Sequence, residues 1–142
     1  MVADASAMAD LSGQLGYPVA VDAVAERLAH ILARDQEVVL VACDDADVVV
    51  GWTHGAEQHL IEENPRCEIL GLVVDRRCRR QGVGQRLVAA LEEWAAARGL
   101  RAMSVRSNIV RRESHPFYER AGYERKKTQH VYRKSIAVTP AP

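Results

Sequence analysis

The stretch from Ile69 to Gly84 constrains the fold and function of this chain more than any other part of its sequence. It starts with the apolar run 69–74, which predicts a buried strand. A turn rich in arginine follows, and Gly82 and Gly84 then open an amphipathic helix. The first turn of a helix has backbone N–H groups without partners, which bind anions, and glycine lets a ligand approach the backbone closely. The stretch therefore predicts a site for a phosphate-bearing ligand.

The size and charge of the chain exclude several classes of protein. Its 142 residues suit one domain with its own core, which we expect over residues 1–136, with residues 137–142 as a disordered tail. The 19 basic and 19 acidic side chains balance, so the sequence does not indicate a nucleic-acid binder that is basic overall. Neither a membrane-spanning run nor a signal peptide is recognisable. Three widely spaced cysteines predict no disulfide framework and no zinc site, and favour a reducing cytoplasm.

Hydrophobic periodicity predicts a single mixed α/β domain. Apolar residues recur at helical spacing over residues 4–15, and a second helix is expected to begin with Asp22 as its N-cap. Apolar runs predict strands at 38–43, 48–60, 67–74 and 102–106, of which the first two form an antiparallel hairpin. Further helices are expected from Gly84 to Gly99 and over 114–121, followed by one or two closing strands within residues 123–132.

The glycine turn differs from two common phosphate-binding loops. It lacks the third glycine of the dinucleotide fingerprint, and no Lys-Ser or Lys-Thr follows Gly84 as in a Walker loop. It does match the pattern Arg/Gln-x-x-Gly-x-Gly/Ala, here Arg79-Arg-Gln-Gly82-Val-Gly84, between a strand and a helix. This resembles the acyl-CoA pyrophosphate loop of the GNAT superfamily of N-acetyltransferases. Taken alone, the turn is equally compatible with a strand–helix connection flanked by solvated arginines.

Two further motifs are similar to those of this family. The run His115-Pro-Phe117-Tyr118, followed by Gly122-Tyr123, resembles its second signature, in which Phe-Tyr precedes a glycine and an aromatic residue. Glu68 stands near the start of the strand predicted at 67–74, where the family's central strand often bears an acidic residue. The resemblance covers residues 38–131. It implies a GNAT-like mixed, mostly antiparallel sheet flanked by helices, with acetyl-CoA as co-substrate.

The resemblance implies chemical roles for two side chains. Tyr118 would donate a proton to the leaving thiolate of CoA, whereas its alternative is a core aromatic with a satisfied hydroxyl. Glu68 would take a proton from the acceptor amine, because a free alkylamine has a pKa of about 10 and must lose its proton to attack. A structural charge at the start of a strand explains Glu68 nearly as well.

The resemblance also implies where acetyl-CoA lies. In the family the central strand bulges and splays from the next strand, which frees backbone groups, here of Leu72 and Val74, for the pantetheine arm. An N–H near Leu72 or Val73 would polarise the thioester carbonyl. The predicted cofactor-binding residues are Leu72, Val73, Val74, Arg79, Arg80, Gln81, Gly82, Val83, Gly84, Gln85, Asn108 and Tyr118.

The sequence thus predicts a cytoplasmic enzyme that transfers acetyl from acetyl-CoA to a primary amine of a small molecule or peptide. The reaction would proceed by direct attack in a ternary complex. The alternative is a non-catalytic acyl-CoA-binding or sensor module. We expect no metal site, no nucleic-acid partner and no membrane partner. The acceptor pocket would form from the segments 16–21 and 52–63, whose candidate contacts are Tyr17, Trp52, Glu57, Glu62 and Glu63.

The start of the chain departs from the family pattern. Family members open with a strand before the first helix, whereas here Met1 lies almost at the start of that helix. We therefore expect a sheet without the usual first strand. Because a bare sheet edge promotes association, we also expect a homodimer.

Overall fold

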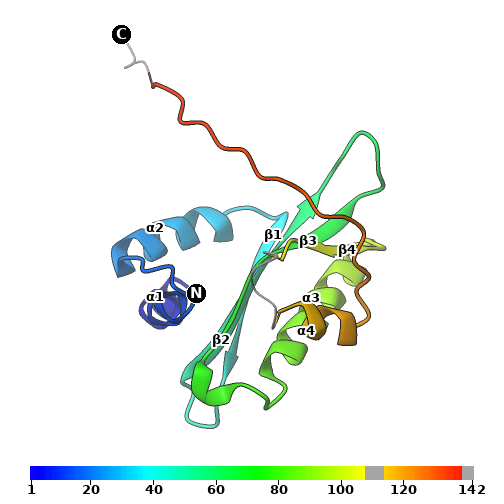
Figure 1. The fold of residues 1–142 in the computed structure, drawn as a ribbon. Coiled ribbons are helices and arrows are strands. Elements are labelled where there is room, and N and C mark those ends of the chain that lie inside the picture. The colour runs from blue at the N-terminus through cyan, green and yellow to red at the C-terminus, as the bar shows by residue number, and fades with distance from the viewer. Residues whose placement is uncertain (108–113, 139–142) are drawn as a thin grey trace. The chain divides into compact units, whose positions relative to one another are not determined.

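The computed structural model describes residues 1–107 and 114–138 (Figure 1). The chain divides into two compact units, Met1–Arg106 and Ser107–Pro142. In the first unit a short 3₁₀ helix, η1 (Val2–Asp4), precedes the α-helices, and within residues 1–36 there is no strand, as the sequence predicted. No helix in the described residues is both long and apolar enough to cross a bilayer.

A four-stranded sheet in the order β1-β2-β3-β4 forms the centre of the first unit. The first three strands pair antiparallel and the fourth runs parallel to the third, which confirms the predicted mixed, mostly antiparallel sheet. The strands lie within two residues of each predicted boundary. They are β1 (Glu37–Cys43), β2 (Val49–Gln58), β3 (Arg66–Val74) and β4 (Met103–Val105).

Helices cover both faces of this sheet. Helices α1 (Ala5–Gln14) and α2 (Val21–Leu32) lie against one face, and α3 (Val83–Ala97) lies against the other (Figure 1). Asp22 is not the N-cap that the sequence predicted for α2, because the helix begins at Val21 and Ala20 occupies the cap. The Asp22 carboxylate instead lies in the first helical turn, where a negative charge favours the helix dipole.

Glycines in β2 and β3 let the layers approach closely. A Cβ on Gly55 would lie 2.5 Å from Leu91 Cδ1 of α3, so a side chain at this position would have to displace Leu91. On the opposite face of the sheet, a Cβ on Gly71 would lie 2.7 Å from Cζ3 of Trp52. Both distances are too short for real carbon atoms, so the packing of α3 on one face and of Trp52 on the other requires glycine at these two positions.

The second unit contains one helix in its described part, α4 (Ser114–Arg120). The closing strands predicted within residues 123–132 are wrong, since residues 123–138 form neither helix nor strand. The apolar side chains of this segment are exposed, by 70% for Val131 and 89% for Tyr132. A strand needs a neighbour for its backbone hydrogen bonds, and the described part of this unit contains no other strand to supply them.

Candidate active site

A break in the pairing of β2 with β3 lies at the centre of the candidate site. From Val74 back to Gly71 the residues of β3 oppose successive residues of β2, with Gly71 opposite His54. The next residue of β2, Gly55, opposes Ile69, so Leu70 is an extra residue on β3. Such a β-bulge bends the strand and interrupts its ladder. The central strand therefore bulges as the resemblance implied, at Leu70.

The same strand loses its second neighbour at the bulge. Strand β4 pairs in parallel with residues 67–69 of β3 and ends there. Within the described residues, the segment 70–74 consequently has a strand partner only in β2. We call this segment the open half of β3, and residues 67–69 the paired half.

The open half directs particular backbone groups away from β2. The N–H of Asp75 donates to Val50 O of the β2 side at 2.8 Å, and in an antiparallel pair every second residue bonds the same neighbour. The backbone of Val73 therefore bonds β2, whereas the N–H and C=O groups of Leu72 and Val74 point to the side without a strand. Of the two N–H groups predicted to polarise a thioester, only that of Leu72 is directed to this edge.

The start of α3 supplies a second set of free backbone donors. Gly82 occupies the N-cap with φ 78°, and no side chain caps the helix. The first helical hydrogen bond runs from Arg86 N–H to Gly82 O at 3.0 Å. The N–H groups of Val83, Gly84 and Gln85 thus precede the first helical bond and have no acceptor within the helix. Three adjacent amides at the positive end of a 15-residue helix fit the pyrophosphate that the sequence predicted here.

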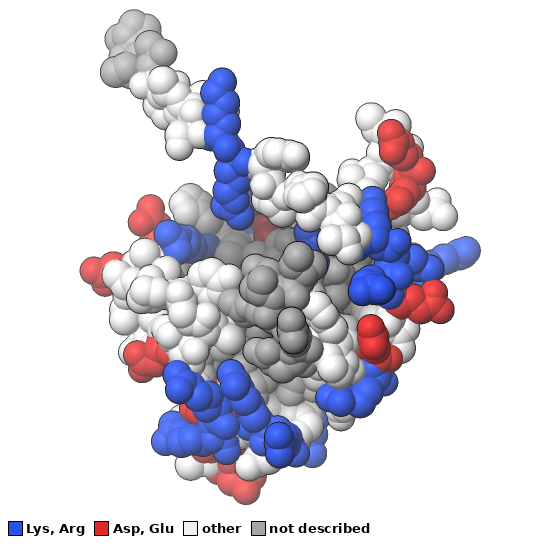
Figure 2. Space-filling model, in the orientation of Figure 1, with Lys and Arg blue, Asp and Glu red and all other residues white. Residues whose placement is uncertain are grey.

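The arginines of the turn divide into structural and free side chains. Arg77 binds the buried Asp75 with Nη2 at 3.1 Å from Oδ2, and Asp75 also caps the 3₁₀ helix η2 (Arg76–Cys78) by accepting from the Arg77 N–H. Hydrogen bonds from Arg77 hold the pKa of Asp75 below its usual range. Arg79 and Arg80 are exposed and form no ion pair with any described residue. Figure 2 shows lysine and arginine side chains gathered where η2 and the start of α3 lie in Figure 1.

Glu68 lies in a row of side chains that crosses the sheet. Ala56 of β2 pairs with Glu37 of β1 on one side and with Glu68 on the other. Directly opposed residues project from the same face, so the two carboxylates flank Ala56 on the face that α1 and α2 cover. Glu68 is 13% exposed and has Arg106 Nε 3.4 Å from Oε1. Glu68 is therefore mostly buried and lies beside Arg106, the ion-pair partner that the structure gives it.

A cavity of about 420 Å³ opens beside this row. Its lining is polar apart from Ala56 and the bulge residue Leu70, and consists of Arg34, Gln36, Glu37, Ala56, Glu57, Gln58 and Leu70. Glu37 accepts from Arg34 Nη1 at 3.1 Å and lies 2.9 Å from His54 Nε2. Burial raises the pKa of Glu37, but hydrogen bonds from His54 and Arg34 outweigh it and leave the pKa below its usual range. Glu37 is not among the site residues expected from the sequence, although its alternation with Val39 in a strand indicates this face of the sheet.

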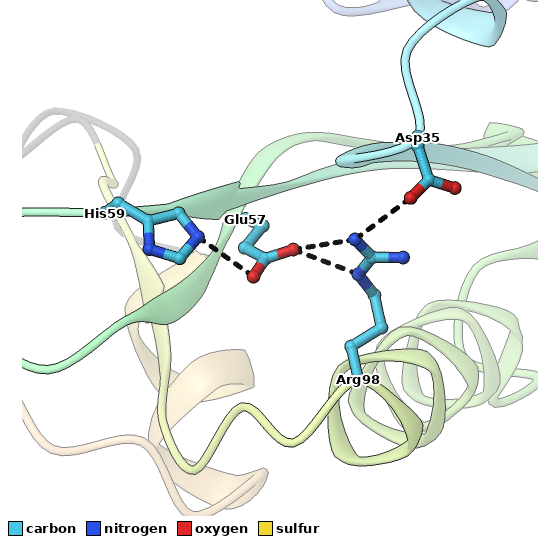
Figure 3. A network of polar contacts seen from close by, with 4 residues as sticks. All are labelled: Asp35, Glu57, His59 and Arg98. Carbon is cyan, nitrogen blue, oxygen red and sulfur yellow. Dashed lines mark hydrogen bonds and ion pairs between the residues drawn. The ribbon is translucent and has the colours of Figure 1, made fainter.

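Glu57, one of the predicted acceptor contacts, already has partners. It lies between His59 and Arg98, and accepts from Arg98 Nη2 at 2.8 Å and Nε at 3.0 Å (Figure 3). Arg98 also approaches Asp35 of the α2–β1 loop at 3.6 Å and lies over the ring of Trp94. The hydrogen bonds from Arg98 keep the pKa of Glu57 below its usual range. Glu57 therefore ties the ends of β2 and α3 together, and like Glu37 it lines the cavity while bonded to neighbouring side chains.

The second unit carries the remaining predicted residues. Tyr118 is partly buried in α4 and packs edge-on against Phe117, with ring centroids 5.1 Å apart, and against Tyr123 at 5.9 Å. Burial raises the pKa of the Tyr118 phenol, so it stays protonated at neutral pH and can donate a proton. Asn108 lies outside the described residues. No group of three or more potential ligands for a metal ion occurs in the described part of the chain.

Comparison with curated proteins finds named N-acetyltransferases. The chain is 41% identical over 66 residues to an aminoalkylphosphonate N-acetyltransferase of Salmonella typhimurium, a match that covers 46% of this chain and 43% of that protein. It is 29% identical over 126 residues to an aminoglycoside N(6')-acetyltransferase type 1 of Stenotrophomonas maltophilia, over 86% of this chain and 81% of that protein. The first of these matches spans less than half of the relative's length.

Solved structures share the fold. The aminoglycoside antibiotic 6'-N-acetyltransferase AAC(6')-Ih from Acinetobacter baumannii has a TM-score of 0.82 at 17% identity, over 96% of this chain and 95% of that chain. The enzyme AAC(6')-Iy, in complex with a bisubstrate analogue that joins CoA to acetylneamine, has a TM-score of 0.82 at 22% identity, over 94% and 93%. At these identities the likeness shows the fold alone.

The family model described as the acetyltransferase (GNAT) family matches residues 6–123, which is most of the chain. The predicted resemblance and the predicted fold class are therefore confirmed. The chain belongs to the acetyltransferase (GNAT) family, whose members are acyltransferases that use acetyl-CoA as the acetyl donor.

Proposed function

We propose that this enzyme transfers acetyl from acetyl-CoA to a primary amine of a small cationic acceptor by direct attack in a ternary complex. The observation that carries the proposal is the open half of β3, which leads through the arginine turn into the free amides of α3. One continuous stretch thus offers unpaired backbone groups to both an extended arm and a pyrophosphate. Acetyl-CoA supplies the acetyl group as a thioester, which is activated toward amines.

The backbone and the arginines form the donor half of the proposed site. The N–H of Leu72 donates to the thioester carbonyl oxygen and stabilises the negative charge that develops there. Val74 bonds the pantetheine arm along the same edge. The amides of residues 83–85 bind the pyrophosphate together with Arg79 and Arg80, whose side chains have no ion-pair partner among the described residues.

Glu68 and Tyr118 move the protons in the proposed reaction. The carboxylate of Glu68, directly or through water, accepts a proton from the acceptor ammonium, and the freed nitrogen forms a bond to the acetyl carbon. As the carbon–sulfur bond breaks, the hydroxyl of Tyr118 gives its proton to the sulfur of CoA, and the second proton that the nitrogen loses on becoming an amide restores the phenol. Its place in the row supports the role of Glu68, because the other two members, Ala56 and Glu37, line the cavity. The partly buried, protonated phenol supports the role of Tyr118.

We propose that the acceptor binds in the cavity beside the bulge. The carboxylate of Glu37 on its wall favours an amine with a second positive charge, and Gln36 and Gln58 favour hydroxyl groups. Of the two curated relatives described above, one is named for aminoglycosides and the other for an aminoalkylphosphonate. An aminoglycoside matches the carboxylate, whereas Arg34 on the same wall would match a phosphonate.

An amine panel tests the function. Release of the CoA thiol from acetyl-CoA would be followed with aminoglycosides, polyamines, aminoalkylphosphonates and a lysine peptide, with Tyr118→Phe as the matched variant. We expect acceptor-dependent release with an aminoglycoside and a marked loss of kcat in Tyr118→Phe. Acetyl-CoA that raises the melting temperature without turnover on any amine would instead favour a non-catalytic sensor. Unchanged turnover in Tyr118→Phe would remove this residue as the acid.

The homodimer and the cytoplasmic location remain predictions. Strand β1 pairs only with β2 within the described residues, so one edge of the sheet has no strand beside it. This edge supports association through backbone pairing. Sedimentation at high concentration tests the dimer, and a single monomeric species would contradict it.

A further inference from the structure

Two buried polar side chains hold the two ends of the open half of β3. Among the described residues, Thr53 and Asp75 are the polar or charged residues counted as buried, with exposed fractions of 0% and 5%. Asp75 follows the last residue of the strand and ties it to the arginine turn. Thr53 lies on β2, and its hydroxyl donates to Gly71 O at 2.8 Å, next to the bulge. Asp75 caps η2, whereas Thr53 caps no helix and instead bonds the backbone of the neighbouring strand.

The bond from Thr53 acts on one peptide plane. The C=O of Gly71 and the N–H of Leu72 belong to the same planar, trans peptide unit, in which oxygen and hydrogen point in opposite directions. Holding the Gly71 oxygen toward β2 therefore holds the Leu72 N–H toward the side without a strand. A hydrogen bond accepted by the oxygen also polarises the unit and strengthens the N–H as a donor.

This peptide plane needs support from outside the strand. The bulge at Leu70 interrupts the ladder immediately before it, and Gly71 has no side chain that would restrict its backbone. Trp52 covers Gly71 on one face of the sheet, which limits its movement in that direction but does not fix the rotation of the peptide. By the alternation of the ladder, Gly71 O also faces His54 of β2, and the Thr53 hydroxyl adds a side-chain hydrogen bond that holds this rotation next to the interruption at Leu70.

We propose that Thr53 is a positioning residue for acetyl transfer, which aims the Leu72 N–H at the thioester carbonyl by holding the Gly71 carbonyl. The inference rests on the proposed function of the open half. Thr53 itself touches neither substrate: it lies buried behind β3, and its effect passes through one peptide bond.

Three variants test this role in the full-length protein. Thr53→Val keeps the shape and removes the donor, Thr53→Ser keeps the donor, and Ile69→Val trims a buried side chain in the paired half as a stability control. We expect Thr53→Val to lower kcat about 10-fold or more, since loss of a whole oxyanion donor costs about 100-fold or more. The KM for acetyl-CoA should change little. Thr53→Ser and Ile69→Val should stay within about threefold of the wild-type kcat. A threefold change corresponds to about 0.6 kcal/mol in the activation free energy, which small repacking can cause.

Nuclear magnetic resonance of the free protein separates this inference from the proposed function. In Thr53→Val the carbonyl resonance of Gly71 and the amide resonance of Leu72 should shift, while those of residues 67–69 should not. Unchanged resonances at Gly71 and Leu72, or an equal loss of kcat in Ile69→Val, would overturn the role of Thr53. A wild-type protein without amine-dependent thiol release would overturn the proposed function, and the resonances would still decide whether Thr53 orients the peptide.

Discussion

The two halves of β3 belong to one strand and have different neighbours. The paired half lies between β2 and β4, with Cys67 fully buried and Ile69 4% exposed. The open half has β2 on one side and no strand among the described residues on the other. Two features separate the halves. One is the bulge at Leu70, and the other is the end of β4 at Val105, which leaves the rest of β3 without a second strand among the described residues. A strand can thus serve as core and as ligand site, depending on where its neighbour stops.

Proline at two adjacent positions of the open half should have the largest effects, and the two variants should differ in whether they fold. Val73→Pro removes an N–H that bonds β2 and should abolish folding, because proline cannot serve in a central ladder. Leu72→Pro removes an N–H directed away from β2, so the protein should fold with reduced stability. It should still lose about 100-fold or more in kcat. Circular dichroism and thiol release measure the two effects. Equal unfolding of both variants would contradict the assignment of backbone directions.

Alanine at two glycines should separate stability from activity. Gly55→Ala forces a Cβ against Leu91 opposite the paired half, and Gly71→Ala forces one against Trp52 in the open half. Both should lower the free energy of unfolding by about 1–3 kcal/mol through overpacking. Only Gly71→Ala should also lower kcat, since it moves the peptide that carries the Leu72 N–H. If Gly55→Ala lowered kcat as much, the two halves would not be functionally distinct.

Loss of Arg79 should raise the KM for acetyl-CoA, whereas loss of Arg77 should not. Arg79→Ala should raise the KM for acetyl-CoA about 10-fold, since a hydrogen bond to a charged group contributes about 1.5–3 kcal/mol. Arg77→Ala should leave this KM nearly unchanged, because Arg77 binds Asp75. A larger KM effect from Arg77 would reverse the assignment of the two side chains.

Acidification gives the complementary measurement for Arg77. The pKa of Asp75 is lowered by Arg77 in the folded protein, against about 3.9 when unfolded. Its stabilising contribution is therefore fully present above about pH 4 and is lost as the pH falls through the folded pKa. Urea unfolding between pH 6 and pH 3 should show a shallower loss of stability in Arg77→Ala than in the wild type. Parallel profiles would indicate that the ion pair does not form.

Cysteine labelling should give the smallest effect and reports whether the paired half stays closed. Burial raises the pKa of Cys67 to about 11, whereas Cys43 is exposed. At pH 8 a thiol reagent should modify Cys43 rapidly and Cys67 only after unfolding. The raised pKa stabilises the fold below the unfolded value of about 8.5, and this contribution is lost as the pH rises toward 11. Rapid native labelling of Cys67 would show that the paired half opens.

The sequence predicted the features that depend on local patterns. The apolar run of β3, the glycine turn and the apolar face of α3 are read from residues close in the chain, and each element lies within a few residues of its expected place. Contacts between distant residues were not predictable. Thr53 meets Gly71 from 18 residues away, and Glu57 meets Arg98 from 41 residues away. The predicted strands after residue 123 required a partner strand, which a local pattern cannot supply.

Amide resonances of the labelled protein during addition of acetyl-CoA test the central claim most directly. We predict that the largest changes occur at Leu72, Val74 and residues 83–85, where the backbone donors have no partner in the described structure. Residues 67–69 of the same strand should change little, because both of their sides are paired. Equal changes in both halves of β3, or none at the start of α3, would contradict the assignment of the acetyl-CoA site.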